Sequence, residues 1–177
     1  MLSLMLLRHA KSSWADPGQA DLDRPLNARG QHAARAMGRH MACHDLVPSL
    51  VLCSPALRAR ETWEVVAGEL KNSPPLLIDP DIYDFEDSEK LLDCLRRKGG
   101  VAPSVLLVGH NPTIAALAQK MSMSGSKKQH RLMEEKYPTC ALAVISIEIG
   151  TWQELTKGAG TLQRFDRPKD ILGEDQA

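Results

Sequence analysis

The sequence has no hydrophobic run long enough to cross a membrane. Its strand-like apolar runs, such as "LMLL" and "VLLV", are far shorter than the roughly 20 apolar residues that a membrane-spanning helix needs. The first residues also lack a basic flank followed by an apolar stretch of secretory length. We therefore expect a cytoplasmic protein with no membrane partner.

The sequence also lacks an excess of charge of either sign. Its 22 Lys and Arg residues balance 22 Asp and Glu residues, so the formal net charge at pH 7 is +0. Proteins that bind nucleic acid or anionic membranes over a large surface usually carry a strong basic excess. We expect no nucleic-acid partner, and any site that binds an anion must be local.

Cysteines are few and widely separated. None of Cys43, Cys53, Cys94 and Cys140 lies at the short spacing from another that is typical of a zinc site or a redox pair. The histidines show no His-rich short spacing with an adjacent carboxylate either. We expect no metal and no cofactor, and we interpret the cysteines as small buried hydrophobic residues.

The order of apolar segments predicts the fold class. A length of 177 residues suits a single domain over residues 1–177. Short apolar runs, which predict strands, alternate with amphipathic segments, which predict helices; the first four runs are "LSLMLL", "SLVLC", "PLLID" and "SVLLVG". Strands that are apolar on both faces favour a parallel sheet covered by helices. We predict a three-layer α/β sandwich with a mostly parallel central sheet and helices on both faces.

The remaining segments predict the rest of the chain. Helices are expected over about residues 28–41, 54–70 and 111–121, and a fourth helix after Ser88 carries Leu91, Leu92 and Leu95; Ser54 and Asn111, each followed by proline, are expected to cap two of these helices. "ALAVISIEIGTWQEL" predicts a strand, a turn at residues 150–151 and a returning strand, which would form an antiparallel edge of the sheet. We expect residues 122–131 to form a mobile basic surface loop and residues 166–177 to fray.

Charged residues follow three of the predicted strands. Arg8 and His9 end the first, Arg58 and Arg60 come soon after the second, and His110 follows the fourth. In an open α/β sheet, ligands bind beyond the carboxyl ends of the strands, so these side chains should converge. Arginine matches phosphate oxygens with a planar fork of donors, and helix starts at Ser54 and Asn111 would add backbone N–H groups. The pattern predicts a phosphate site.

Histidine in a phosphate site favours catalysis as well as binding. A neutral imidazole is nucleophilic near pH 7 and can form a phosphoenzyme that water later opens. Fixed arginines would stabilise the transferring phosphoryl group without a metal ion. The residues also leave open a binding module without activity and a cysteine-based phosphatase on Cys53. For the latter, the arginine expected after five intervening residues is missing, because position 59 is alanine.

These segments resemble the motifs of a known family. "LLRHAKSSW", "SPALRARET" and "GHNP" resemble the three signatures of the histidine phosphatase superfamily, with alanine in place of the glycine that often follows the first histidine. "DRPLNARG" and "PTCALAVI" resemble its short phosphohistidine phosphatase branch, so that the resemblance covers about residues 4–168. It implies the family's α/β fold and a phosphatase that needs no metal.

The resemblance also implies roles for individual residues. His9 would be the nucleophile, Arg8 and Arg58 would bind the phosphoryl group, and His110 would complete the pocket. Three further residues are candidate substrate contacts, namely Ser12, Lys11 and Asn111. Ala15 stands where longer family members often have an asparagine, so one phosphate contact could be missing.

For the proton donor and for the substrate, the sequence offers alternatives. The acidic stretch "DPDIYDFEDSE" follows the third strand, and by its position Asp84 is the candidate acid, with a solvated acidic loop as the alternative. A phosphohistidine substrate would need only a weak acid, because its imidazole leaves as a neutral base whose conjugate acid has a pKa near ~6.5. We predict a phosphorylated protein as substrate; a small phosphoester is the alternative. The basic segment 122–131 is a candidate contact for an acidic partner.

Overall fold

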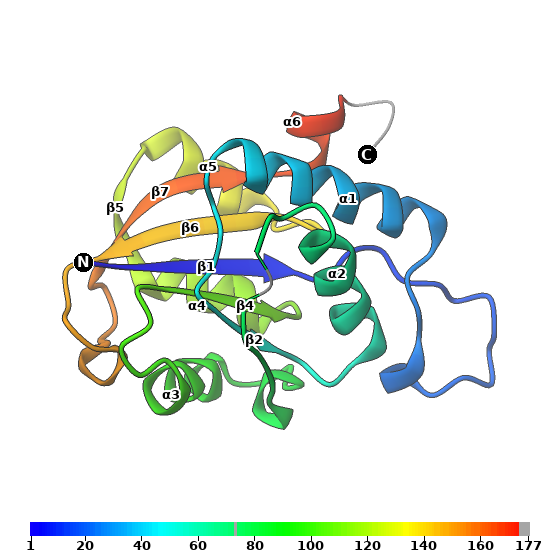
Figure 1. Ribbon diagram of the computed structural model, residues 1–177, viewed down its shortest axis with the longest axis horizontal. Coiled ribbons are helices and arrows are strands. Elements are labelled where there is room, and N and C mark those ends of the chain that lie inside the picture. Colours follow the sequence, from blue (N-terminus) through cyan, green and yellow to red (C-terminus); the bar gives the residue numbers. More distant parts are fainter. Residues whose placement is uncertain (73, 174–177) are drawn as a thin grey trace.

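In the part of the chain that the structure describes, seven strands form one sheet. The computed structural model describes residues 1–72 and 74–173. Its strands are β1 (Leu2–Arg8), β2 (Leu50–Cys53), β3 (Leu76–Ile78), β4 (Ser104–Gly109), β5 (Ser122–Gly125), β6 (Leu142–Ile147) and β7 (Gly160–Asp166). They lie in the order β3-β2-β4-β1-β6-β7-β5 (Figure 1). All neighbouring strands pair in parallel except β6, which is antiparallel to both β1 and β7.

Helices cover both faces of this sheet. They are α1 (Ala28–Cys43), α2 (Leu57–Ala67), α3 (Ser88–Lys98), α4 (Thr113–Met121), α5 (Lys127–Glu135) and α6 (Pro168–Leu172). Short 3-10 helices span Asp21–Asp23, Pro80–Ile82 and Trp152–Glu154. The first two helices and α6 pack on one face, and α3, α4 and α5 on the other. Within the described residues, no helix combines the length and the apolar character that crossing a membrane requires.

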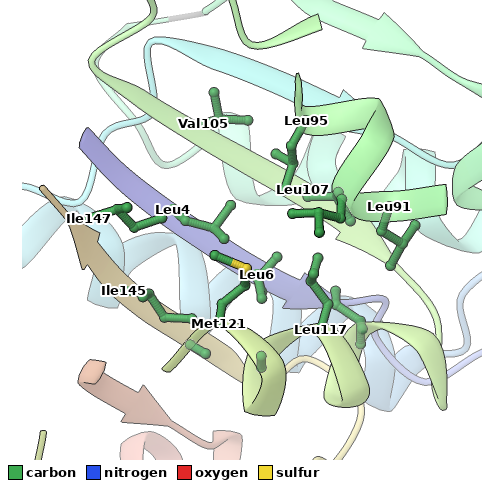
Figure 2. Packing of buried hydrophobic residues seen from close by; sticks show 14 of the residues in the cluster. Leu4, Leu6, Leu91, Leu95, Val105, Leu107, Leu117, Met121, Ile145 and Ile147 are labelled. Atoms are coloured by element: carbon green, nitrogen blue, oxygen red, sulfur yellow. The ribbon is translucent and has the colours of Figure 1, made fainter. Parts of the chain in front are cut away.

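The central strand β1 carries the core on both of its faces. Side chains alternate across a strand, so Leu4 and Leu6 point to one cluster of buried residues and Met5 and Leu7 to the other. Figure 2 shows the first cluster, in which Leu4 and Leu6 lie against side chains of β4, β6, α3 and α4. Burial of each such side chain stabilises the fold by about 1.5–3 kcal/mol. These contacts hold the carboxyl end of β1, where the candidate site begins, in a rigid frame.

The predicted fold class is confirmed, and two details of the sheet differ. Five of the six predicted strands appear as β1, β2, β3, β4 and β6, and the four predicted helices as α1 to α4. The antiparallel strand β6 is internal, whereas we expected it at an edge. The returning strand starts at Gly160, about eight residues later than predicted, because residues 152–154 form a 3-10 helix. It pairs with the outer side of β6, and β5 then pairs with it.

Two segments expected to be irregular are ordered. Residues 122–131, predicted as a mobile loop, form β5 and most of α5. The reason is tertiary, because β5 pairs with β7 and Met133 of α5 is buried in the core. The tail from Asp166, which we expected to fray, starts with the last residue of β7 and continues into α6. Ile171 of α6 packs against the core near α1. Residues 174–177 lie outside the described part of the chain.

Three smaller expectations are wrong. Asn111 does not cap α4; its side-chain amide donates to the carbonyl oxygen of Tyr137 at 2.9 Å. Ser54 accepts a hydrogen bond from the backbone N–H of Ala56, but α2 begins only at residue 57. Among the cysteines, Cys43, the last residue of α1, is exposed, while the other three are buried as predicted.

Candidate active site

His9 follows the carboxyl end of β1 directly. Its side chain is almost fully buried, and its Nδ1 lies 2.7 Å from the carbonyl oxygen of Ala10. A carbonyl oxygen can only accept a hydrogen bond, so Nδ1 carries the proton and Nε2 keeps its lone pair. Burial lowers the pKa of His9 to about 4, and the positive charge of Arg58 adds to this effect against the opposing bond to Ala10. The imidazole is therefore neutral at pH 7, as a nucleophile must be.

His110 lies beside His9, at the end of β4. The two imidazole rings are 4.9 Å apart between their centroids. Nε2 of His110 lies 2.7 Å from Ser54 Oγ, and its Nδ1 is 3.4 Å from Arg58 Nη2. Burial, followed by the influence of His9 and Arg58, lowers the pKa of His110 to about 2. His110 is a second neutral histidine that packs beside His9.

Three arginines surround this pair. Arg8 ends β1, Arg58 lies in the first turn of α2, and Arg24 follows the 3-10 helix at residues 21–23. Each has one buried guanidinium nitrogen without a hydrogen-bond partner in the described part of the chain: Nε of Arg8, Nε of Arg58 and Nη1 of Arg24. An unsatisfied buried charged donor is costly. All three arginines line one cavity, and three guanidinium groups around one cavity indicate a site for a multiply charged anion.

Arg24 was not among the residues predicted for the site. It belongs to "DRPLNARG", a stretch that contributed to the family resemblance but follows no strand. Its guanidinium stacks on the ring of Trp14, 3.5 Å from the ring centroid, and is bonded through Nε to Asp21 at 2.9 Å. The arginine of this motif was the signal in the sequence that could have identified Arg24 as a site residue.

Asp21 supplies negative charge between two of the arginines. Its carboxylate accepts a hydrogen bond from Arg58 Nη2 at 2.9 Å, and the hydroxyl of Tyr83 donates to the same carboxylate oxygen. Partial burial would raise the pKa of Asp21, but these bonds from Tyr83 and Arg58, with the charge of Arg24, lower it to about 2. Asp21 is thus ionised and holds the arginines in place.

Contacts behind the site fix the loop that carries His9. The hydroxyl of Thr62 accepts from the backbone N–H of Ala10 at 2.9 Å and donates to the carbonyl oxygen of Arg58 at 2.6 Å. Gly30 of α1 packs against the same loop, since a Cβ at this position would lie 2.1 Å from the carbonyl oxygen of Lys11. Thr62 and Gly30 explain why the motifs "SPALRARET" and "DRPLNARG" contain these residues.

The side chains enclose a cavity of about 450 Å³. All three predicted substrate contacts line it, together with the three arginines, His9, Asp21 and the exposed aromatic residues of its rim; the lining residues are Arg8, His9, Lys11, Ser12, Trp14, Asp21, Arg24, Arg58, Phe85, Asn111 and Thr139. His110 lies behind the lining, covered by Tyr83 and Phe85. Arg60 is exposed and does not line the cavity.

The structure does not favour Asp84 as the proton donor. Asp84 is absent from the cavity lining, and its carboxylate is bonded to Lys90 and to the backbone N–H groups of Glu86 and Asp87. The bond from Lys90, followed by those from the backbone, lowers the pKa of Asp84 to about 2. A carboxylate with this pKa has no proton to give near pH 7.

Cys53 is unsuited to be a nucleophile. Burial raises the pKa of its thiol to about 12, and the thiol donates to the carbonyl oxygen of Ser54. Since the thiolate is the reactive form, this cysteine is inert near pH 7. Across residues 1–72 and 74–173, no group of three or more histidine, cysteine or carboxylate side chains is arranged to hold a metal ion.

Fold and site together define a class of protein. A neutral histidine at the carboxyl end of a parallel strand, ringed by arginines with unpaired donors, is suited to phosphoryl transfer through histidine. The family model of the histidine phosphatase superfamily (branch 1) matches residues 4–91.

Individual relatives agree with this match. An uncharacterised protein of Mycobacterium tuberculosis is 33% identical over 165 residues, which cover 92% of this chain and 100% of that protein. The solved structure of a provisionally named phosphohistidine phosphatase, SixA, from Agrobacterium tumefaciens is 30% identical and covers 94% of this chain and 98% of its own, with a TM-score of 0.79. A second provisionally named SixA, from Nakamurella multipartitia, is 27% identical, with a TM-score of 0.76 and coverage of 94% and 96%. The chain belongs to the histidine phosphatase superfamily.

Proposed function

We propose that this protein is a metal-independent phosphatase that acts on phosphohistidine in other proteins through a covalent phosphohistidine on His9. The observation that carries the proposal is the set of three buried, unpaired arginine donors around a neutral His9. Dianionic phosphoryl oxygens would satisfy these donors, and the same contacts would stabilise the transferring group. The family assignment and the SixA neighbours support a phosphatase.

The reaction has two displacement steps. In the first, the lone pair of His9 Nε2 forms a bond to phosphorus while the bond from phosphorus to the substrate nitrogen breaks. The substrate imidazole leaves as a neutral base if its other nitrogen is protonated. The carbonyl oxygen of Ala10, which accepts from Nδ1, stabilises the positive charge of the phosphorylated ring. In the second step water attacks phosphorus, the electron pair returns to Nε2, and the protons of water leave with phosphate and to solvent.

The absence of a suitable acid supports phosphohistidine as the substrate. Among the described residues that line the cavity, the one carboxylate is Asp21, whose pKa is about 2. An alkoxide leaving group needs a strong proton donor, whereas imidazole does not. The exposed rim residues Trp14, at 77%, and Phe85, at 40%, leave access for a side chain presented by another protein. The cytoplasmic location of the protein is a prediction from the sequence.

The test compares two classes of substrate. Turnover of the purified full chain is measured with EDTA present, on a phosphocarrier domain that bears phosphohistidine and on p-nitrophenyl phosphate with a panel of small phosphoesters. We expect fast turnover of the phosphohistidine domain, and inhibition by EDTA that a divalent ion reverses would contradict the metal-independent mechanism. Preference for a phosphoester would show that a competent acid exists and would assign the protein to small substrates.

His9→Ala tests the intermediate. We expect a folded protein with less than about 1% of wild-type turnover and no acid-labile phosphate trapped on the chain. The matched control is His32→Ala, because His32 is exposed on α1 outside the cavity. Residual activity well above that level in His9→Ala would exclude a His9 nucleophile. Binding of phosphate without turnover by the wild-type chain would leave only a binding module.

A further inference from the structure

A second cavity, of about 580 Å³, adjoins the candidate active site. Lys11 and Thr139 line both cavities, so the two are contiguous. Its walls come from the first half of α1, from the end of α5 with the segment that follows, and from the start of α6. The lining residues are Lys11, Arg29, Ala33, Glu135, Lys136, Pro138, Thr139, Arg167, Pro168 and Lys169. We call this cavity the basic groove.

The charge of the basic groove is unlike that of the whole chain. Half of its ten lining residues are lysine or arginine, and one is acidic, Glu135. Asp170, outside the lining, is bonded to Arg167 at 2.7 Å and 2.9 Å and offsets one more positive charge. The groove therefore keeps a basic excess in a protein whose formal net charge is +0. Such a local excess raises the concentration of acidic partners at the site.

The tertiary structure creates this groove. Arg29, Lys136 and Lys169 lie more than thirty residues apart in the sequence and belong to three different segments. They come together because α6 packs against α1, and Figure 1 shows α6 alongside α1. The lysines predicted to meet an acidic partner, Lys127 and Lys128, lie instead at the start of α5 and line neither cavity.

We infer that the basic groove binds an acidic segment of the phosphoprotein substrate while the phosphorylated side chain of that protein occupies the cavity at His9. The inference rests on the proposed function. A volume of about 580 Å³ exceeds what one phosphate group needs and has room for several side chains. Because Lys11 and Thr139 line both cavities, the groove adjoins the place that the phosphohistidine of a bound polypeptide would occupy.

The test reverses charge in the groove without touching the cavity at His9. In the double variant Lys136→Glu and Lys169→Glu, both side chains are exposed and neither lines that cavity. The matched control is Lys127→Glu with Lys128→Glu, which makes the same change of charge outside the groove. Each variant is assayed at low and at high salt on an acidic phosphohistidine-bearing domain and on phosphoramidate, a small compound with the same bond between phosphorus and nitrogen.

We expect the groove variant to lose about tenfold or more in kcat/KM on the phosphoprotein, through KM, at low salt, and to lose much less at high salt. Its turnover of phosphoramidate and its melting temperature should match wild type, and the control variant should keep its activity on both substrates. Equal losses in both double variants, a parallel loss on phosphoramidate, or no loss at all would each overturn the inference. A wild-type enzyme that hydrolyses only phosphoesters would instead refute the proposed function, and the docking inference with it.

Discussion

Replacing Arg24 with alanine removes one of the three unpaired donors that surround His9. Nη1 of Arg24 is buried and without a partner in the described part of the chain, while its Nε and Nη2 are bonded to Asp21. One charge-assisted hydrogen bond to a phosphoryl oxygen contributes about 1.5–3 kcal/mol. If the transition state uses this donor, kcat/KM should fall about 10- to 150-fold.

The variant should also lose some stability. Arg24→Ala removes the stacking on Trp14 and the ion pair with Asp21, in which the Arg24 side chain is 8% and the Asp21 side chain 44% exposed, so we expect a loss of about 1–2 kcal/mol. Arg24→Lys keeps the charge but lacks the planar fork, so we expect an intermediate loss of activity. Initial rates on phosphoramidate and on a phosphohistidine-bearing domain, with thermal melts of each variant, provide the measurement.

Arg60→Ala is the matched control, because Arg60 is exposed and lies outside the cavity. It should retain wild-type kcat/KM on both substrates. If Arg24→Ala also stayed within about threefold of wild type, the assignment of unpaired arginine donors as phosphoryl ligands would be refuted. The same result would contradict the interpretation of these arginines on which the proposed function depends.

Three further predictions concern protonation. Because burial lowers the pKa of His9 to about 4, the acid limb of kcat/KM should fall only below about pH 5, and a midpoint near the ordinary histidine pKa of about 6.5 would contradict a buried neutral nucleophile. As the pH falls, His9 and His110 take up protons in the unfolded chain at a higher pH than in the folded chain. The stability that these neutral histidines contribute is therefore complete above about pH 6.5 and is lost as the pH falls toward their pKa values in the folded chain. Thermal melts across this pH range measure the loss. Asp84→Asn should leave turnover of phosphohistidine within about twofold of wild type, because Asp84 is already ionised and points to Lys90; a tenfold loss of kcat would restore it as the acid.

The fold class and the first residues of the site could be predicted from the sequence. Apolar runs of strand length specify buried strands wherever they fall in space, and parallel strands place their carboxyl ends at one edge of the sheet. This is why the structure brings Arg8, His9, Arg58 and His110 together as expected. Only the local pattern of apolar residues and the direction of the chain are needed to place these strand ends, and the sequence contains both.

Segments that depend on distant partners could not be predicted in the same way. Residues 122–125 are polar apart from Met123 and form a strand only because β7 offers backbone partners. The helix α6 is short, and isolated helices of that length are unstable, so its order comes from packing beside α1. Asp84 shows the same limit, because its position in the sequence does not reveal that its carboxylate is bonded to Lys90.

The sequence by itself determined which residues can carry phosphoryl chemistry, since strand ends, histidines and arginines are local features. Only the tertiary structure decided that Arg24 and Asp21 join them and that Lys136 and Lys169 form a basic groove beside them. These residues lie on connections and on short helices, whose position is set by packing against α1, α2 and β7. Charge becomes a binding site only when packing brings side chains from separate segments within reach of one ligand.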